Sequence, residues 1–271
     1  MDDIRDVLFH GIQNKKYRAV LTAERSGVLS GTQAACDCAK ELGFTLELCK
    51  AEGEELSHNE RFGNFLASPK QIALAEERLI GTLAKASGIA TAARTAVQLA
   101  DGKARIVSGS WKKMPPAIKD LVRTATASGG AAFRICQPPM VYLDKNFIRM
   151  LGSIPAALDA CRNLPQFSRV VQIRGLSASV EEETAQALEG GADILMVDTG
   201  NRLDLERCVK TLDLLGRRKT VQVAFAGNVR LTDIPDLTNW DIDILCIGKE
   251  IVDAGLLDMK LDVLQEEFSW D

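Results

Sequence analysis

The sequence is poor in the residues from which most metal centres and catalytic triads are built. Its 271 residues include only two histidines, His10 and His58, both in the N-terminal quarter among polar neighbours. A histidine-based metal site or a Ser-His-Asp triad therefore has almost nothing to draw on. The seven cysteines are odd in number and show no C-x-x-C spacing, so we expect reduced thiols rather than a disulfide framework.

Long apolar runs and an overall basic character are absent as well. No stretch reaches the roughly 18 apolar residues of a membrane-spanning helix, and the N-terminal "MDDIRDVLF" is acidic rather than basic. The net charge of −4 and the pI near 5.4 argue against a surface for nucleic acid or anionic membrane. We expect a cytoplasmic protein with no nucleic-acid or membrane partner.

The composition suits a soluble globular protein with a large buried core, since 46% of the residues are hydrophobic and 26% are charged. Residues 1–104 mix short strand-like segments with helical ones, among them "TQAACDCAKEL". From about residue 70 to 100 the apolar residues recur at helical spacing, with Gly81 and Gly88 as expected breaks. We predict an N-terminal α+β and helical domain over 1–104.

The pattern changes after residue 104, where strand-like apolar runs alternate with helix-like segments. The runs are "ARIVS", "PMVYL", "RVVQIR", "DILMVD", "TVQVAFAG" and "DILCIG". Near-continuous Val, Ile and Leu are typical of parallel strands buried on both faces. Residues 105–271 are therefore predicted to form an open parallel βα barrel of about six strands with a C-terminal tail, which makes the fold class α/β.

The carboxyl ends of parallel barrel strands carry the chemistry of such folds. In chain order, the residues predicted there are Lys112 and Lys113, Asp144, Gln172 and Arg174, Asp198, Gly227 and Asn228, and Gly248 with Lys249. Cations beside glycine-rich loops suit a ligand that carries phosphate or carboxylate. The alternative for the adjacent lysines of "SGSWKKMPPAIKDL" is a merely solvated loop.

Several motifs, in one order along nearly the whole chain, resemble the type II phosphoribosyltransferases typified by quinolinate phosphoribosyltransferase. "AERSGVLSG" is similar to that family's "ARExGVxxG", "SGIAT" is shared, and "WKKMPPAIK" stands where the family has "TRKTTPGLR". The later matches are "FR" for "HR", "VYLDKNFI" for "xLIKDNHI", "VQI" for "VEV", "GGADILMVDTG" for "AGADIIMLDNM" and "AFAGNV" for "EASGGI". The chain is identified as a divergent or ModD-like member of this nicotinate-nucleotide pyrophosphorylase family.

The resemblance implies an N-terminal domain packed on an open barrel, in a homodimer or higher homo-oligomer with shared active sites. It implies a magnesium-dependent reaction of quinolinate or a related aromatic acid with phosphoribosyl pyrophosphate, within NAD biosynthesis. The site residues carried over fall into four groups: catalytic Lys113, Asp198 and Gln172; substrate-binding Arg78, Lys112, Lys119, Arg134 and Asp144; phosphate-binding Gly227, Asn228, Gly248 and Lys249; and metal-binding Asp198.

The sequence departs from the family pattern at three of these motifs. Phe133 replaces a histidine, Asp144 replaces a lysine, and Gln172 replaces a glutamate. An aspartate in a pocket for two carboxylates opposes the ligand by about a few kcal/mol, so we expect weak quinolinate turnover and a gain of affinity from Asp144→Lys. The alternatives are a paralogue with another aromatic acceptor, a non-catalytic anion-binding protein, and a lyase that uses Lys113 as a Schiff base.

Overall fold

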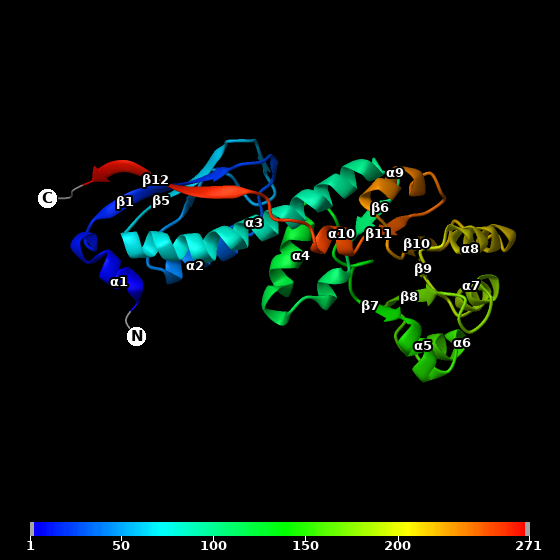
Figure 1. The fold of residues 1–271 in the computed structure, drawn as a ribbon. Coiled ribbons are helices and arrows are strands. Elements are labelled where there is room, and N and C mark those ends of the chain that lie inside the picture. The colour runs from blue at the N-terminus through cyan, green and yellow to red at the C-terminus, as the bar shows by residue number, and fades with distance from the viewer. Residues whose placement is uncertain (1–2, 269–271) are drawn as a thin grey trace. The chain divides into compact units, whose positions relative to one another are not determined.

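The computed structural model describes residues 3–268, which form two compact units (Figure 1). The first unit holds the chain up to Thr95, the segment Trp111–Gly130 and the chain from Ile251 onward. The second unit holds Ala96–Ser110 and Ala131–Glu250. The division therefore differs from a single boundary after residue 104, because two later segments pack with the N-terminal part of the chain.

A four-stranded antiparallel sheet forms the centre of the first unit, with strand order β12-β1-β5-β3. The strands are β1 (Lys16–Ala23), β3 (Glu47–Leu48), β5 (Arg61–Ala67) and β12 (Met259–Phe268). The segment expected as a tail of the barrel is thus a strand that pairs with β1 along its length. The short strands β2 (Gly27–Val28) and β4 (Glu55–Leu56) pair separately, and α1 (Ile4–Leu8), η1 (His10–Ile12) and α2 (Thr32–Glu41) complete this part.

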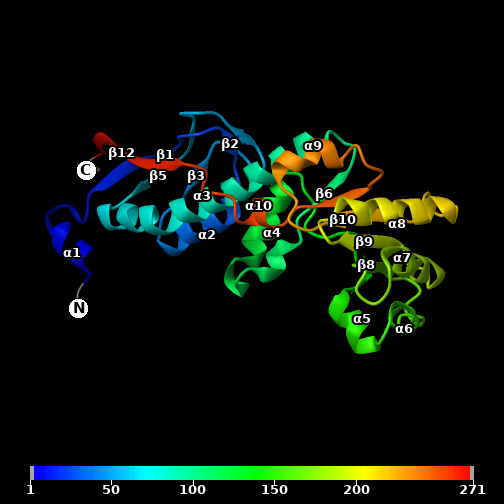
Figure 2. The same ribbon diagram turned by 45° about the vertical axis from the view of Figure 1, so that its right-hand side comes forward.

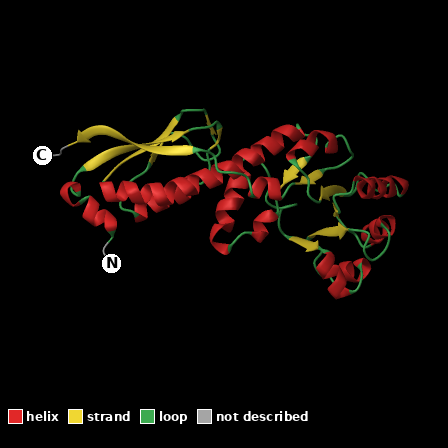
Figure 3. Cartoon of the chain, in the orientation of Figure 1, coloured by secondary structure: helices red, strands yellow, loops and turns green. Residues whose placement is uncertain are grey.

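Helix α3 runs without interruption from Pro69 to Ala100, as Figure 3 shows, so the expected breaks at Gly81 and Gly88 do not occur. Gly88 instead permits a close approach: a Cβ there would lie 1.9 Å from the carbonyl oxygen of Gly255. Gly81 faces open space. Neither α3 nor any other described helix is long and apolar enough to cross a membrane.

Apolar side chains from the sheet and the helices form the core of the first unit. Leu21, Phe62 and Phe65 of the sheet are buried in one cluster with Leu79 and Leu83 of α3. The remaining elements of this region are η2 (Ser110–Lys113), η3 (Pro116–Ile118) and α4 (Lys119–Ser128). All seven cysteines lie in the described residues, and none of them forms a disulfide there.

The second unit contains a six-stranded parallel sheet in the order β6-β11-β10-β9-β8-β7. Figure 1 labels all six strands, and Figure 2 shows β6, β10, β9 and β8 after a turn of the view. Its strands match the six predicted runs: β6 (Arg105–Val107), β7 (Met140–Leu143), β8 (Ser168–Ile173), β9 (Ile194–Asp198), β10 (Gln222–Ala226) and β11 (Ile244–Cys246). β6 and β7 are the two edges of the ladder, so the barrel is open, as predicted.

Helices follow the strands of the second unit and place their loops at the carboxyl ends of the sheet. They are α5 (Lys145–Leu151), α6 (Ile154–Asp159), α7 (Val180–Glu189), α8 (Arg202–Leu214), α9 (Ile234–Leu237) and α10 (Lys249–Val252), with the 3-10 turn η4 (Leu231–Asp233) before α9. Polar caps fix where these helices begin: Ser179 and Glu182 form a reciprocal capping box on α7, and Asn201 caps α8. The loops between strand and cap are consequently short and well positioned.

Candidate functional site

A hydrogen-bonded group of polar side chains lies where β7, β8 and β9 end. The amide Nε2 of Gln172 donates to Oδ2 of Asp198 at 2.6 Å, and its Oε1 accepts the backbone N–H of Lys145 at 2.7 Å. Arg174 pairs with the same oxygen of Asp198 at 3.3 Å. Gln172 is only 7% exposed, so the strand ends hold Asp198 in one orientation between an amide and a guanidinium.

Asp144 ends the loop after β7, but its carboxylate is engaged by its own helix. Oδ1 accepts the backbone N–H groups of Asn146 at 2.8 Å and Phe147 at 3.0 Å, which makes Asp144 the N-cap of α5. The negative charge is therefore met by backbone donors rather than directed at a ligand. The substitution Asp144→Lys therefore removes the N-cap of α5 as well as the negative charge, and the gain in quinolinate affinity stays a prediction.

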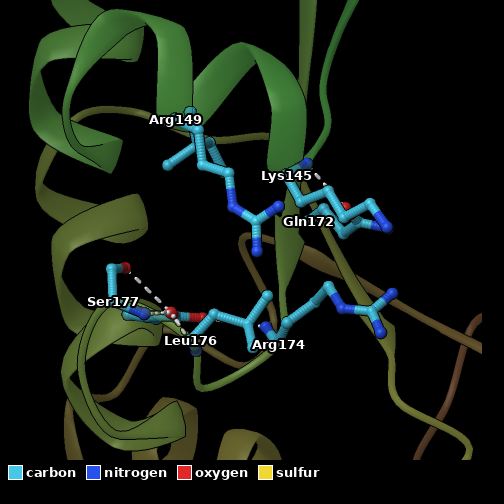
Figure 4. Close-up of a pocket in the computed structure, with 8 residues that line it drawn as sticks. Lys145, Arg149, Gln172, Arg174, Leu176 and Ser177 are labelled. Carbon is cyan, nitrogen blue, oxygen red and sulfur yellow. Dashed lines mark hydrogen bonds between the residues drawn. The ribbon is translucent and has the colours of Figure 1, made fainter.

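A cavity of about 140 Å³ lies beside this group, between α5 and the segment that follows β8 (Figure 4). It is lined by Lys145, Ile148, Arg149, Gln172, Arg174, Leu176, Ser177 and Glu183. Lys145, like Glu183, is not among the site residues predicted from the sequence, and neither is Arg149. Its signal was its spacing from Lys145, because positions i and i+4 share one face of a helix.

The segment between β8 and α7 is organised by one buried carboxylate. Glu183, 3% exposed, accepts the backbone N–H groups of Arg174, Gly175, Leu176 and Ser177 at 2.8–3.0 Å. Burial raises the pKa of this carboxyl group, but the backbone N–H groups outweigh burial and hold the pKa below its usual value. Glu183 thus stays charged and fixes the backbone that presents Arg174.

The predicted phosphate-binding residues occupy loops whose backbone is tightly packed. Gly227 has φ +116°, and a Cβ there would lie 2.3 Å from the backbone nitrogen of Gly200. Asn228 follows with φ 53°, a left-handed conformation. Gly248 lies against Ser110, whose Oγ would be 2.2 Å from an added Cβ. These loops follow β10 and β11, and Lys249 adds an exposed cation directly after Gly248.

The remaining predicted residues belong partly to the other unit. Arg78 is exposed on α3, Lys112 and Lys113 are exposed on η2, and Lys119 begins α4, all in the first unit. The η2 turn is anchored on α4, because the Arg123 guanidinium carbon lies 4.8 Å from the Trp111 ring centre. Arg134 is exposed in the second unit, and its guanidinium lies 6.0 Å from the ring centre of Phe133.

An open parallel barrel with a held aspartate, several cations and tight glycine loops at its strand ends defines an enzyme class that handles phosphate-bearing or carboxylate-bearing substrates. The comparison with known families agrees. Residues 3–87 match the N-terminal domain and residues 89–262 match the C-terminal domain of quinolinate phosphoribosyl transferase. The chain belongs to the quinolinate phosphoribosyl transferase family, and the resemblance of its motifs to that family is confirmed.

Individual relatives cover almost the whole chain. The nicotinate-nucleotide pyrophosphorylase (carboxylating) of Rattus norvegicus is 29% identical over 252 residues, which are 92% of this chain and 82% of the relative. A probable enzyme of the same name from Methanothermobacter thermautotrophicus is 24% identical over 90% of this chain and 88% of its own. The solved nicotinate-nucleotide pyrophosphorylase of Francisella tularensis has the same fold, with a TM-score of 0.82, 20% identity, and coverage of 96% of this chain and 90% of that one.

Proposed function

We propose that this enzyme transfers the phosphoribosyl group of phosphoribosyl pyrophosphate to the ring nitrogen of a pyridine carboxylic acid, quinolinate or a close relative, with release of pyrophosphate. The observation that carries the proposal is the position of Asp198 at the end of β9, held by Gln172 and Arg174, in a chain that matches both domains of the family.

The reaction forms a bond between the ring nitrogen and C1 of ribose and breaks the bond from C1 to pyrophosphate, which leaves with the electron pair. Positive charge develops on the sugar meanwhile, and a fixed carboxylate such as that of Asp198 stabilises it without reorganisation. Gln172 keeps this carboxylate in place through its hydrogen bond. In the carboxylating reaction the substrate then loses carbon dioxide: the electron pair of the broken carbon–carbon bond stays on the ring carbon, stabilised by the positive charge of the adjacent ring nitrogen, and a proton from solvent replaces the carboxylate.

The acceptor and the donor need different partners from the protein. Arg78, Lys112, Lys113, Lys119 and Arg134 are the cations proposed for the acceptor carboxylates and the leaving pyrophosphate. The ribose 5′-phosphate is assigned to the loops of Gly227, Asn228, Gly248 and Lys249, which follow the neighbouring strands β10 and β11 and carry the exposed cation of Lys249. Lys113 is solvent-exposed, whereas a Schiff-base lysine is typically desolvated, so nothing favours the lyase alternative.

The residues at Asp198 fit a magnesium ion that arrives on the donor. Among residues 3–268, no group of three or more His, Cys, Asp or Glu side chains is arranged to hold a metal. Magnesium commonly keeps several waters and uses one or two carboxylates together with substrate phosphates. A single carboxylate from Asp198 suits that arrangement, and the ion would neutralise charge on the departing pyrophosphate.

The assembly and location proposed for the enzyme are a homodimer or higher homo-oligomer in the cytoplasm. The exposure of Arg78 on α3 supports a shared site, since an arginine that projects from the first unit is available to a neighbouring subunit. The acidic composition supports a location away from membranes and nucleic acid.

Pyrophosphate release tests the proposed reaction directly. The full chain is incubated with phosphoribosyl pyrophosphate and magnesium, and quinolinate, nicotinate and other pyridine dicarboxylates are supplied one at a time. We expect release that requires both donor and acceptor, together with a nucleotide product detected by mass. Release that is independent of any acceptor, or no release with the whole panel, contradicts the proposal.

A further inference from the structure

The cavity beside α5 is lined by three cations that follow two neighbouring strands. Lys145 and Arg149 come from α5 after β7, and Arg174 comes directly after β8. Figure 4 shows Arg149 extending from α5 toward the side of the cavity where Arg174 and Leu176 lie. The sequence pattern predicts an anion at the glycine loops after β10 and β11 and does not indicate this cavity.

The cations of this cavity are incompletely paired. Within residues 3–268, neither Lys145 nor Arg149 forms an ion pair with a carboxylate, and Arg174 pairs only with Asp198. The Nε–H of Arg174 is buried and has no hydrogen-bond acceptor. A buried donor without a partner is rare in folded proteins, so it points to an acceptor that the protein does not itself supply.

The carboxylates nearby do not cancel this positive charge. Glu183 also lines the cavity, but its oxygens accept four backbone N–H groups and the hydroxyl of Ser177. Asp144 is directed to the N-terminus of α5, and Asp198 is met by Arg174 and Gln172. An anionic group that enters the cavity therefore meets three cations, and every carboxylate nearby already accepts hydrogen bonds from the protein.

The walls of the cavity indicate what kind of anion fits. Ile148 and Leu176 contribute apolar surface next to the cations. At about 140 Å³ the space is smaller than the roughly 300 Å³ of a complete small-ligand pocket, so it suits one part of a ligand. A carboxylate attached to an apolar ring matches this mixture better than a fully polar pyrophosphate.

We propose that this cavity receives a carboxylate of the acceptor acid, held by Lys145, Arg149 and Arg174. Gln172 and Arg174 both line the cavity and both contact Asp198, so an acid bound there lies beside the residue that faces the sugar. The family pattern has a lysine at position 144, and in this chain Lys145 and Arg149 supply the positive charge instead. This inference rests on the proposed function, because it takes the acceptor to be a pyridine carboxylic acid.

Calorimetric titration of the full chain with quinolinate tests the assignment apart from turnover. The variants are Lys145→Gln and Arg149→Gln, which remove one charge each and leave Asp198 and its partners in place. Arg162→Gln is the matched control, since Arg162 lies in the same unit with its side chain 79% exposed and outside the cavity. Thermal unfolding shows whether each variant is folded, and inorganic pyrophosphate is titrated in parallel.

We expect each cavity variant to weaken quinolinate binding at least ten-fold, while Arg162→Gln and the titrations with pyrophosphate change less than two-fold. The assignment is overturned if both cavity variants bind quinolinate as tightly as the wild-type chain, or if the control Arg162→Gln loses as much affinity as they do. It is also overturned if the cavity variants lose affinity only for pyrophosphate, or if the wild-type chain does not bind quinolinate. If quinolinate binding depends on Lys145 and Arg149 but the chain releases no pyrophosphate from phosphoribosyl pyrophosphate, the cavity assignment is supported and the proposed reaction is contradicted.

Discussion

Gln172 is a neutral side chain among charged ones, and it serves both of its neighbours. Its carbonyl accepts from Lys145 and its amide donates to Asp198. A glutamate keeps the first of these hydrogen bonds but has no donor for the second. The family's glutamate at this position is therefore not equivalent to Gln172 in this chain, where the amide is what orients Asp198.

The substitution Gln172→Glu tests this role. It places two carboxylates at a distance that now holds a 2.6 Å hydrogen bond, so we expect turnover at pH 7 to fall by about ten-fold or more. Lowering the pH should recover part of the loss, because one proton shared by the pair relieves the repulsion. Steady-state rates from pH 5.5 to 8 measure this, with Gln172→Ala as the variant that loses the amide without gaining charge. A fully active Gln172→Glu enzyme would show that the amide does not orient Asp198.

At the scale of the elements, the sequence predicts strands better than it predicts the roles of the residues after them. The six runs of Val, Ile and Leu became the six parallel strands, because burial on both faces leaves a strong pattern. The family pattern makes Asp144 a charge of the wrong sign, whereas its place directly before a helical segment is typical of an N-cap, which is what the structure shows. Arg149 has no distinctive signal in the sequence, since a cation one helical turn from Lys145 becomes significant only through the cavity beside both.

Helix α3 provides a comparison between two glycines of one element. Gly81→Ala adds a methyl group in open space and should stabilise the helix by up to about 1 kcal/mol. Gly88→Ala puts Cβ 1.9 Å from the carbonyl oxygen of Gly255, so we expect a loss of about 1–3 kcal/mol. Urea unfolding of both variants gives the two free energies. Equal effects at the two positions would show that the close contact of Gly88 is not formed.

The stability that Glu183 gives to the loop between β8 and α7 should decrease as the pH falls. Because the pKa of Glu183 is lowered in the folded chain, its contribution to stability is present above the pKa of the unfolded state and is lost as the pH falls through the folded pKa. We expect Glu183→Gln to cost about 2 kcal/mol at pH 7 and progressively less in acid. Urea unfolding at several pH values tests this, and a difference between wild type and variant that does not shrink in acid contradicts it.

At the scale of the whole molecule, the chain returns twice to its first unit. Residues 111–130 and the chain from Ile251 belong to the same compact unit as the N-terminal sheet, Gly129 lies against α3, and β12 pairs with β1. Runs of hydrophobic residues indicate a strand but not the strand with which it pairs, so the sequence does not predict that these two segments join the first unit. The lysines of η2 consequently belong to the first unit, together with Arg78.

Sharing of active sites between subunits is tested by mixing two inactive variants. If Arg78 serves a neighbouring subunit, Arg78→Ala and Lys113→Ala chains that are unfolded together and refolded should form some sites with both wild-type residues. We expect activity of up to about a quarter of wild type in the mixture and none in either variant alone. Inactive mixtures in which mass analysis finds hybrid oligomers would rule out a contribution of Arg78 in trans.

Phosphoribosyl transfer at the carboxylate of Asp198 is tested most sharply by the rate at which the variant Asp198→Asn releases pyrophosphate. The asparagine keeps the size of the side chain but removes its charge. With saturating donor and acceptor, we predict a fall in kcat of about a hundred-fold or more, while the unfolding midpoint stays near that of wild type and donor binding is still measurable. A variant that releases pyrophosphate at the wild-type rate would contradict the account.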